Sequence, residues 1–362
     1  MAKKKKGFSK FWKNFITCLQ VVNVVGLWIC ALTAFISPEY CKALVIFSLG
    51  FPIALLATFV SLLLSLIFTF KRSWISAVGL LACAGSIRTY VPMNVPHTAP
   101  SNSFSVMTYN THNLGKETDP ESGRHEMMEY LRHCNVDIVV AQEAQPTSEM
   151  YADSLKSVYP YWRRQMAGAP AQVIFSKFPI VADSLLNPLQ QRVVVYWVKV
   201  SPQDTVGIVS CHLQSTRLKS KDRENFGAFV YNKTENADDM ESSAFSIVSS
   251  LMENSKKRAV QVDSIASLLE KFEGKKIILC GDFNDTPISY TREKIRSSLG
   301  LTDCFRATGN GVGRSFNRYG MYVRIDHMFC SDKLKPYEAK VDKGIFASDH
   351  YPMICRFKID KK

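Results

Sequence analysis

The chain has 362 residues, of which 46% are hydrophobic and 21% charged, and its formal net charge is +13. The charge is uneven, since residues 1–102 contain ten Lys or Arg and one acid, whereas residues 103–362 contain 35 bases and 31 acids. Most of the positive charge flanks apolar N-terminal segments, where Lys and Arg typically set the orientation of membrane helices. This distribution argues against a basic nucleic-acid-binding surface.

Two long uncharged runs follow a basic N-terminus. Residues 15–36 and 43–70 contain no charged side chain. Lys13 and Lys71 lie just outside them, and Glu39 and Lys42 lie between them. About 20 apolar residues are needed to cross a bilayer as a helix, and both runs reach that length. We therefore expect two transmembrane helices.

A third apolar run, residues 74–87, is only 14 residues long before Arg88. It is short enough to be interfacial or re-entrant, and it spans a bilayer only if Arg88 extends its charge to the lipid surface. With the N-terminal lysines and Lys71 and Arg72 held inside, a third span places everything after Pro92 outside. We expect a multi-pass membrane protein whose C-terminal domain is extracytoplasmic.

A polar segment with three prolines, residues 92–103, separates the apolar runs from the rest of the chain. Such composition is typical of a linker at a domain boundary. The sequence therefore predicts a membrane anchor over residues 1–91, with two to three transmembrane helices, a linker over 92–103 and one domain over 104–362.

From residue 103 onward, strand-like runs alternate with helical periodicity. Helices are predicted over 124–134 and 243–272 from the spacing of their apolar residues. Strands are predicted over 104–110, 137–143, 171–175, 193–200, 205–212, 276–281, 322–330 and 351–359. Many strands with intervening helices in about 260 residues favour a layered α/β or α+β sandwich.

Polar side chains follow several of these strands where each ends. Asp282 and Asn284 come directly after the apolar run 276–280, and residues two apart in a strand point to the same face. An aspartate there can accept a proton from water, and an amide can donate to an oxyanion.

Taken singly, each such residue is explained as well by a turn former, a solvated strand end or a core histidine. Together they favour a metal-dependent phosphoesterase, since sites in α/β sheets form beyond the carboxyl ends of strands.

Six short motifs follow one another in the chain: Tyr109-Asn110, Gln142-Glu143, His212-Leu213, Gly281-Asp282-Phe283-Asn284, Arg324-Ile325-Asp326-His327 and Ser348-Asp349-His350. They resemble those of the endonuclease/exonuclease/phosphatase superfamily, the deoxyribonuclease-I-like fold. This superfamily includes abasic-site endonucleases, inositol polyphosphate phosphatases and neutral sphingomyelinases. The resemblance covers about residues 103 to 360 and implies a four-layer α/β sandwich, in which two packed mixed β-sheets are flanked by helices.

The resemblance implies a metal site. Glu143 would be the main ligand, helped by Asn110 and Asp349. A carboxylate with neutral oxygens and waters is the ligand set that Mg²⁺ prefers, and Mn²⁺ is an alternative.

The resemblance also implies catalytic roles. Asp282 would orient or deprotonate the attacking water, and Asn284 would hold a phosphate oxygen. His350, oriented by Asp326, would stabilise the transition state or protonate the leaving group, and His212 would be a second donor on the phosphate side.

The resulting hypothesis is a membrane-anchored, Mg-dependent phosphoester hydrolase, foremost a phosphodiesterase or endonuclease-like enzyme. A lipid-headgroup phosphodiesterase of the sphingomyelinase kind and a phosphomonoesterase are alternatives, and a non-catalytic binding scaffold is an alternative of another class. The expected partners are a phosphoester substrate (nucleic acid, lipid headgroup or sugar phosphate) and the lipid bilayer, whereas the oligomeric state stays open. Residues 216–257, a long mixed-charge segment, form either a solvated loop or part of the substrate pocket.

Overall fold

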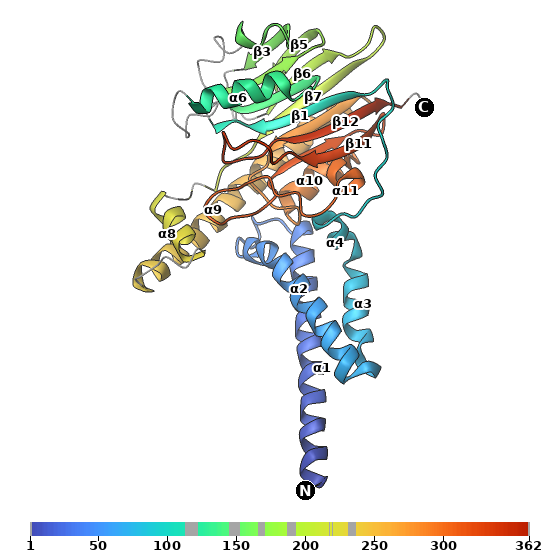
Figure 1. The fold of residues 1–362 in the computed structure, drawn as a ribbon, viewed down its shortest axis with the longest axis vertical. Helices are drawn as coiled ribbons and strands as arrows, with labels where there is room; N and C mark the ends of the chain where they lie inside the picture. Colours follow the sequence, from blue (N-terminus) through green and yellow to red (C-terminus); the bar gives the residue numbers. More distant parts are fainter. Residues whose placement is uncertain are drawn as a thin grey trace.

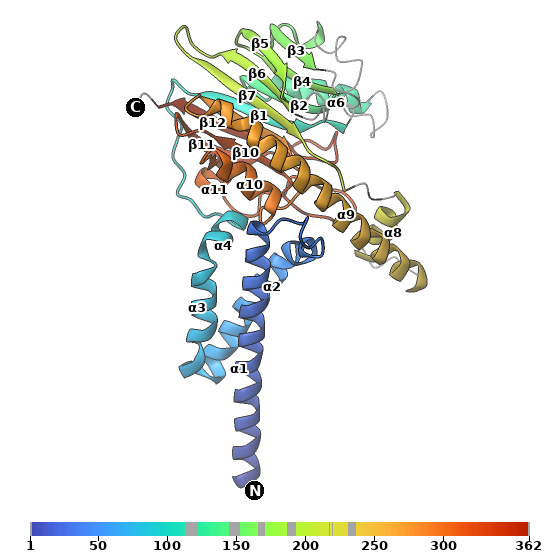
Figure 2. The ribbon, with the colours of Figure 1, turned by 180° about the vertical axis from the view of Figure 1, so that it is seen from behind.

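The N-terminal helices extend as a rod from one side of an α/β sandwich, as Figures 1 and 2 show from opposite sides. The structure, a computed structural model, describes residues 2–112, 122–144, 153–165, 171–186, 193–216, 218, 220–230 and 237–360.

Within the described residues, the sandwich contains two six-stranded sheets. The first has the order β11-β12-β1-β2-β4-β3 and consists of β1 (Phe104–Asn110), β2 (Ile138–Ala144), β3 (Tyr161–Gln165), β4 (Ala171–Ser176), β11 (Leu334–Val341) and β12 (Met353–Ile359). The second has the order β5-β6-β7-β8-β10-β9 and consists of β5 (Ile180–Leu185), β6 (Val193–Lys199), β7 (Thr205–His212), β8 (Ile277–Asp282), β9 (Thr302–Asp303) and β10 (Asp326–Cys330).

The two sheets pack face to face over one apolar core. Val106 and Val140 of the first sheet belong to the same buried cluster as Ile208 and Ile278 of the second. On the outer face of the first sheet lies helix α6 (Ser122–His133). The outer face of the second is covered by α9 (Ala237–Leu269) and α10 (Tyr290–Ser298). The prediction of a four-layer α/β sandwich is confirmed.

Strand register places the polar strand ends at one edge of the sandwich. Strands β7 and β8 are parallel, with His212 opposite Asp282, and antiparallel β10 places Asp326 opposite Asp282 on the other side. In the other sheet, parallel β1 and β2 pair Asn110 with Gln142. Side chains from both sheets therefore meet where these strands end.

The structure differs from the sequence prediction at the sheet edges. Strands β3, β5, β9 and β11 and helices α8 (Ser220–Val230), α10 and α11 (Cys304–Thr308) were not predicted. In the predicted strand 322–330, only Asp326–Cys330 pairs in the sheet. The predicted helix 243–272 begins earlier, at Ala237, and ends in the 3₁₀ turn Glu270–Phe272.

The rod consists of α1 (Ala2–Leu32), the 3₁₀ turn Thr33–Phe35, α2 (Leu44–Phe68), the 3₁₀ turn Phe70–Arg72, α3 (Trp74–Ala82) and α4 (Ala84–Tyr90). Among the described residues, two helical segments are long and apolar enough to cross a membrane, Lys10–Phe35 with mean hydropathy 2.1 and Leu44–Phe68 with 2.5. The third apolar run is divided between α3 and α4 and packs along α1, where the Trp28 indole donates to the Gly79 carbonyl at 3.2 Å. The two long helices could serve as membrane anchors.

Polarity in the rod is inverted relative to a water-soluble helical bundle. Gln20, Ser61 and Ser76 are buried between the helices, and the Ser76 hydroxyl donates to the Gln20 side chain at 3.2 Å. Ile53 and Ile67 are each 73% exposed on the outside of α2. Polar and small residues between helices with apolar residues outside are typical of helices packed in lipid.

The rod is joined to the sandwich by buried polar contacts. The Arg324 guanidinium, 2% exposed, donates to the Thr89 carbonyl at 2.5 Å and to the Val312 carbonyl at 2.6 Å. In the predicted linker, the Asn94 side-chain amide donates to the Gly309 carbonyl at 2.6 Å. The segment 92–103 therefore lies against the sandwich, and the division into 1–91, 92–103 and 104–362 stays a prediction.

A buried histidine in β10 should make stability depend on pH. His327 lies between Phe283 and Phe329, and burial lowers its pKa from 6.5 to about 4. Between these two values the unfolded chain binds a proton that the folded chain excludes, so stability falls as the pH falls, by up to about 1.4 kcal/mol per pH unit.

Thermal unfolding at pH 7.5 and 5.0 checks this. The His327→Gln variant keeps a neutral donor toward the Asp285 carbonyl, which His327 contacts at 2.9 Å, and should lose less stability on acidification than the natural chain. An equal loss in both proteins would contradict a contribution from His327.

Candidate active site

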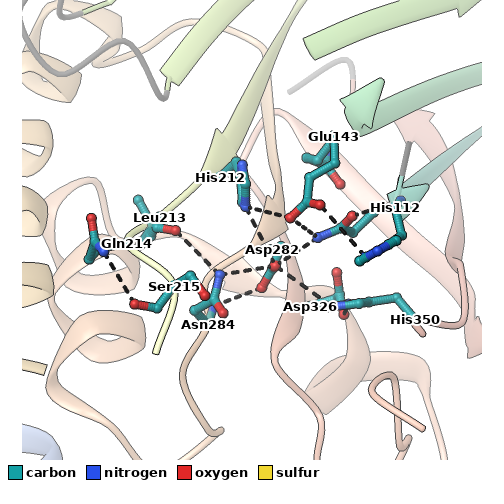
Figure 3. Close-up of polar contacts among 12 residues, drawn as sticks. His112, Glu143, His212, Leu213, Gln214, Ser215, Asp282, Asn284, Asp326 and His350 are labelled. Carbon is teal, nitrogen blue, oxygen red and sulfur yellow. Dashed lines mark hydrogen bonds and ion pairs between the residues drawn. The ribbon is translucent and has the colours of Figure 1, made fainter. Parts of the chain in front are cut away.

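The centre of the site is Asp282, a buried carboxylate at the end of β8. Its Oδ1 accepts the Asn284 backbone amide at 2.8 Å, and its Oδ2 accepts the side-chain amides of Asn284 at 3.0 Å and Asn110 at 3.1 Å (Figure 3). Burial raises the pKa of Asp282 to about 6, in spite of the nearby His350. The carboxylate is thus fixed from both sheets and has a proton affinity suited to general-base catalysis near neutral pH.

Local backbone geometry positions this turn. Gly281 has a φ of +145°, and a Cβ atom there would lie 1.8 Å from the Cys211 carbonyl oxygen, so only glycine allows β7 and β8 to approach this closely. Asn284 has a φ of +51°, a left-handed conformation that asparagine tolerates better than most residues. The motif therefore depends on glycine and asparagine for its shape.

Glu143 enters the site from β2 through an irregularity in the strand. The register between β2 and β4 shifts between Ala141 and Ala144, and Glu143 has a φ of +52°. Its Oε1 lies 3.1 Å from the Asn110 amide nitrogen and 3.3 Å from His212 Nε2. Burial would raise the pKa of Glu143, but the hydrogen bonds and the charge of His212 outweigh it and lower the pKa to about 2.

His350 lies on the opposite side of Asp282. Its Nδ1 lies 2.8 Å from Asp326 Oδ2 and its Nε2 lies 3.9 Å from Asp282 Oδ2. The edge of the Phe316 ring packs against its imidazole. Burial opposes the charge of the ring, but Asp326 and Asp282 outweigh it and raise the pKa of His350 well above its usual value. The imidazolium form, with Nε2 directed to the centre, therefore prevails at neutral pH.

A third histidine, not among the predicted site residues, contacts the remaining carboxylate. His112 Nδ1 lies 3.4 Å from Asp349 Oδ1 and 3.9 Å from Glu143 Oε2. Burial would raise the pKa of Asp349, but His112 and His350 outweigh it and lower the pKa below its usual value. The sequence signal for His112 was its position two residues after Asn110, just beyond the end of β1.

The residues predicted to hold a metal fit a hard cation by their chemistry. Glu143 and Asp349 are ionised at neutral pH, as their lowered pKa values require. Ligand atoms of Glu143, His212 and Asp282 all lie within 4.8 Å of one another. Asn110 directs its amide nitrogen at Glu143 and Asp282, so it would offer its oxygen to a metal only with the amide turned over. Oxygen donors of this kind suit Mg²⁺, Mn²⁺ or Ca²⁺.

The site opens into a cavity of about 550 Å³. Beside the catalytic candidates, its lining includes Ser215, Asp285 and the buried Arg258 of α9. Arg258 Nη1 donates to the Gln214 carbonyl at 3.0 Å, and its Nε lies 3.5 Å from Asp285 Oδ2. The segment 216–257, expected to form either a solvated loop or part of the substrate pocket, lines the cavity through Thr216, Ile247 and Leu251 among others. Sequence patterns did not indicate the other walls, because they come from segments far apart in the chain.

The chain combines a two-sheet sandwich with carboxylates, amides and histidines gathered at its strand ends. This combination is that of a metal-dependent phosphoric ester hydrolase. Residues 107–350 match the model of the Endonuclease/Exonuclease/phosphatase family, and the chain belongs to this family. The superfamily predicted from the six motifs is confirmed, and the chain is a hydrolase of phosphoester bonds.

Solved structures are similar to the chain at low sequence identity. The catalytic domain of human Nocturnin with a bound sulfate anion is 14% identical, with a TM-score of 0.51, over 72% of this chain and 96% of that one. A family protein from Bacteroides thetaiotaomicron is 16% identical, with a TM-score of 0.49, over 73% and 100%. Truncated TDP2 from Caenorhabditis elegans is 18% identical, with a TM-score of 0.46, over 70% and 97%.

The N-terminal part has its own match. Residues 13–90 match a family model described as a domain of unknown function. No curated protein matches the chain.

Proposed function

We propose that the chain is a membrane-anchored, Mg²⁺-dependent phosphodiesterase. The observation that carries this proposal is the pairing, at one point, of a buried carboxylate, Asp282, with a cationic imidazole, His350, whose Nε2 lies 3.9 Å away. A diester is favoured over a monoester because the cavity of about 550 Å³ extends well beyond the room that a phosphate requires and can take a second ester substituent.

Each catalytic residue has a role that its contacts support. Asp282 accepts the proton of the attacking water, and the three amide hydrogen bonds on its oxygens hold it in place. His350 Nε2 donates to a phosphate oxygen as negative charge develops, while Asp326 holds Nδ1. Asn284 would bind a phosphate oxygen by exchanging one of its two side-chain amide contacts, to Asp282 Oδ2 at 3.0 Å or to the Leu213 carbonyl at 3.3 Å, for the substrate. His212 donates from the side of Glu143.

Glu143 would be the main Mg²⁺ ligand, with Asp349 and the turned-over amide of Asn110 completing the protein's share. The bound ion would neutralise phosphate oxygens and stabilise charge on the leaving group. His112, between Glu143 and Asp349, restrains both carboxylates by its contacts at 3.9 and 3.4 Å.

The anchor is proposed to cross the membrane three times. In both ribbon views α1 runs toward the sandwich, α2 runs away from it and α3 with α4 returns to it. Trp74–Ala82 and Ala84–Tyr90 together are 17 residues including Cys83, a rise of about 25 Å, which approaches the hydrocarbon thickness of a bilayer. The inverted polarity of the rod supports the lipid environment.

Reporter fusions test this topology. With the basic N-terminus, Lys71 and Arg72 inside, a reporter after Arg72 should be cytoplasmic, and reporters after Pro92 and Lys362 should be extracytoplasmic. A cytoplasmic signal after Pro92 would remove the third crossing and place the catalytic domain inside.

Turnover of two chromogenic esters tests the proposed reaction. The full chain in detergent with Mg²⁺ should hydrolyse bis-p-nitrophenyl phosphate with a higher kcat/KM than p-nitrophenyl phosphate. A strong preference for the monoester would replace phosphodiesterase by phosphomonoesterase, with the same residues in the site.

A further inference from the structure

The cavity at the active site is polar at one end and apolar over most of its length. Its polar end contains Asp282, His350 and Glu143. The remaining lining is dominated by apolar side chains that come from α2, the segment just before α8, α8 itself, α9 and the loop before β10. These are Val45, Leu49, Leu218, Phe226, Ile247, Leu251, Met321, Val323 and Ile325.

Helix α9 shows in which direction the cavity extends. Ile247, Leu251 and Arg258 line it from one helix, at spacings of four and seven residues that share a helical face. Arg258 lies at the catalytic end, 3.5 Å from Asp285, three residues after Asp282. From Arg258 back to Ile247 the helix covers about 16 Å. The cavity therefore runs from the catalytic residues along α9 toward its N-terminal half.

The opposite wall belongs to the membrane anchor. Val45 and Leu49 lie in the first turns of α2, at the end of the rod next to the sandwich (Figure 1). An ion pair between Lys42 and Glu253 joins the turn before α2 to α9. Ile46, in the same turn of α2 as Val45, does not line the cavity and is 43% exposed. With α2 in lipid, as the proposed anchor requires, the apolar part of the cavity would lie near the membrane surface.

We propose that this apolar part binds the hydrocarbon chain of an amphiphilic phosphodiester, so that the substrate is a membrane phospholipid and the anchor forms a wall of the substrate site. The inference rests on the proposed phosphodiesterase activity. The scissile phosphodiester lies at Asp282 and His350 and a chain lies between α2 and α9. Water adds to phosphorus, one P–O ester bond breaks, and the departing oxygen takes up a proton.

The chemistry of the lining favours a lipid over a nucleic acid. Nonspecific single-strand binders use a basic groove with stacked aromatic rings. Among the described residues that line this cavity, the basic ones are Arg223, Arg258 and the site histidines His112 and His350. Three lining residues are aromatic, Phe226, Phe316 and Tyr322, and the apolar side chains between α2 and α9 are aliphatic. A phosphate with a hydrocarbon chain matches both ends of the cavity.

The test measures the chain-length dependence of turnover. Ethyl, butyl and hexyl p-nitrophenyl phosphates are assayed with the full chain and Mg²⁺, below the concentrations at which they form micelles. If the apolar part binds the alkyl group, kcat/KM should rise with length, by up to about fourfold per added methylene.

Four variants locate the effect. Leu251→Trp on α9 and Leu49→Trp on α2 fill the cavity from its two walls and should flatten the dependence on chain length. The matched controls are Val260→Trp on α9, where the side chain is 46% exposed, and Leu56→Trp on α2, where it is 63% exposed. Both controls should keep the dependence of the natural chain. Partition of the esters into detergent affects every variant equally, so differences between variants report the cavity itself.

The outcomes separate the two proposals. Turnover that does not depend on chain length, or that depends on it equally in Leu49→Trp and Leu56→Trp, overturns the chain-binding cavity and leaves the phosphodiesterase standing. Absence of turnover for every ester overturns the proposed function, and the inference falls with it. In a final arm, the full chain in nanodiscs should hydrolyse a long-chain phospholipid, and faster hydrolysis of single-stranded DNA or RNA would overturn the lipid assignment.

Discussion

Replacing Asp282 by Asn should lower kcat by about 10²–10⁴-fold while the protein stays folded. The amide almost keeps the shape of the carboxylate but cannot accept the proton of the attacking water. Asp282 accepts three amide hydrogen bonds, from Asn284 N, Asn284 Nδ2 and Asn110 Nδ2, so an Asn side chain there keeps some of them and loses others. Steady-state kinetics beside circular dichroism and thermal unfolding check the loss of activity and the retained fold.

A parallel loss is expected at His350. His350→Gln removes the cation that faces the developing charge, so kcat should fall more than KM rises. It retains an amide that can donate to Asp326, whose carboxylate is 1% exposed and would otherwise be buried without its partner. Full activity in either variant would contradict the roles assigned to the pair.

Glu143→Gln should also inactivate the enzyme at low metal concentration, but for a different reason. The change removes the carboxylate charge that a hard cation requires and should weaken metal binding, while leaving Asp282 and His350 in place. Raised Mg²⁺ or Mn²⁺ should therefore restore much of the turnover of Glu143→Gln. Neither Asp282→Asn nor His350→Gln should respond to added metal.

Metal titrations of kcat/KM for the three variants measure this contrast. Rescue of Asp282→Asn by metal would contradict its role as the base, and full activity of Glu143→Gln at low metal would contradict its role as the metal ligand. The family assignment would stand in either case.

The edge of the sheets at which the candidate site lies could be predicted because local pattern determines it. The β-branched runs that become β1, β7 and β8 end in polar residues at fixed spacing, and parallel pairing brings His212 level with Asp282. Each strand end is encoded within a few residues, so the sequence alone indicates which side chains share one edge.

The edge strands and the cavity depend on packing that no local pattern contains. Strand β11 includes Lys335, Pro336 and Lys340 and alternates buried with exposed positions, which obscures an apolar run. The cavity joins Leu49 of the anchor to Leu251 of α9, two residues about 200 positions apart in the chain. Their proximity follows from how the rod is placed against the sandwich, and the periodicity of either helix predicts only that it is a helix.

His112 and Arg324 illustrate the same limit. His112 follows the end of β1, but its place between Glu143 and Asp349 depends on the bulge in β2 and on the loop before β12. Arg324 belongs to a motif predicted to lie within a strand. Its guanidinium instead packs on the Phe305 ring at 4.3 Å and donates to the anchor, so it joins the two parts of the chain.

The most direct test of the account is the metal dependence of phosphodiester turnover by the purified full chain. Protein stripped with EDTA should not hydrolyse bis-p-nitrophenyl phosphate, and added Mg²⁺ should restore hydrolysis, whereas Asp282→Asn should stay inactive at every metal concentration. Equal turnover with and without EDTA, or turnover by Asp282→Asn equal to that of the natural chain, would contradict it.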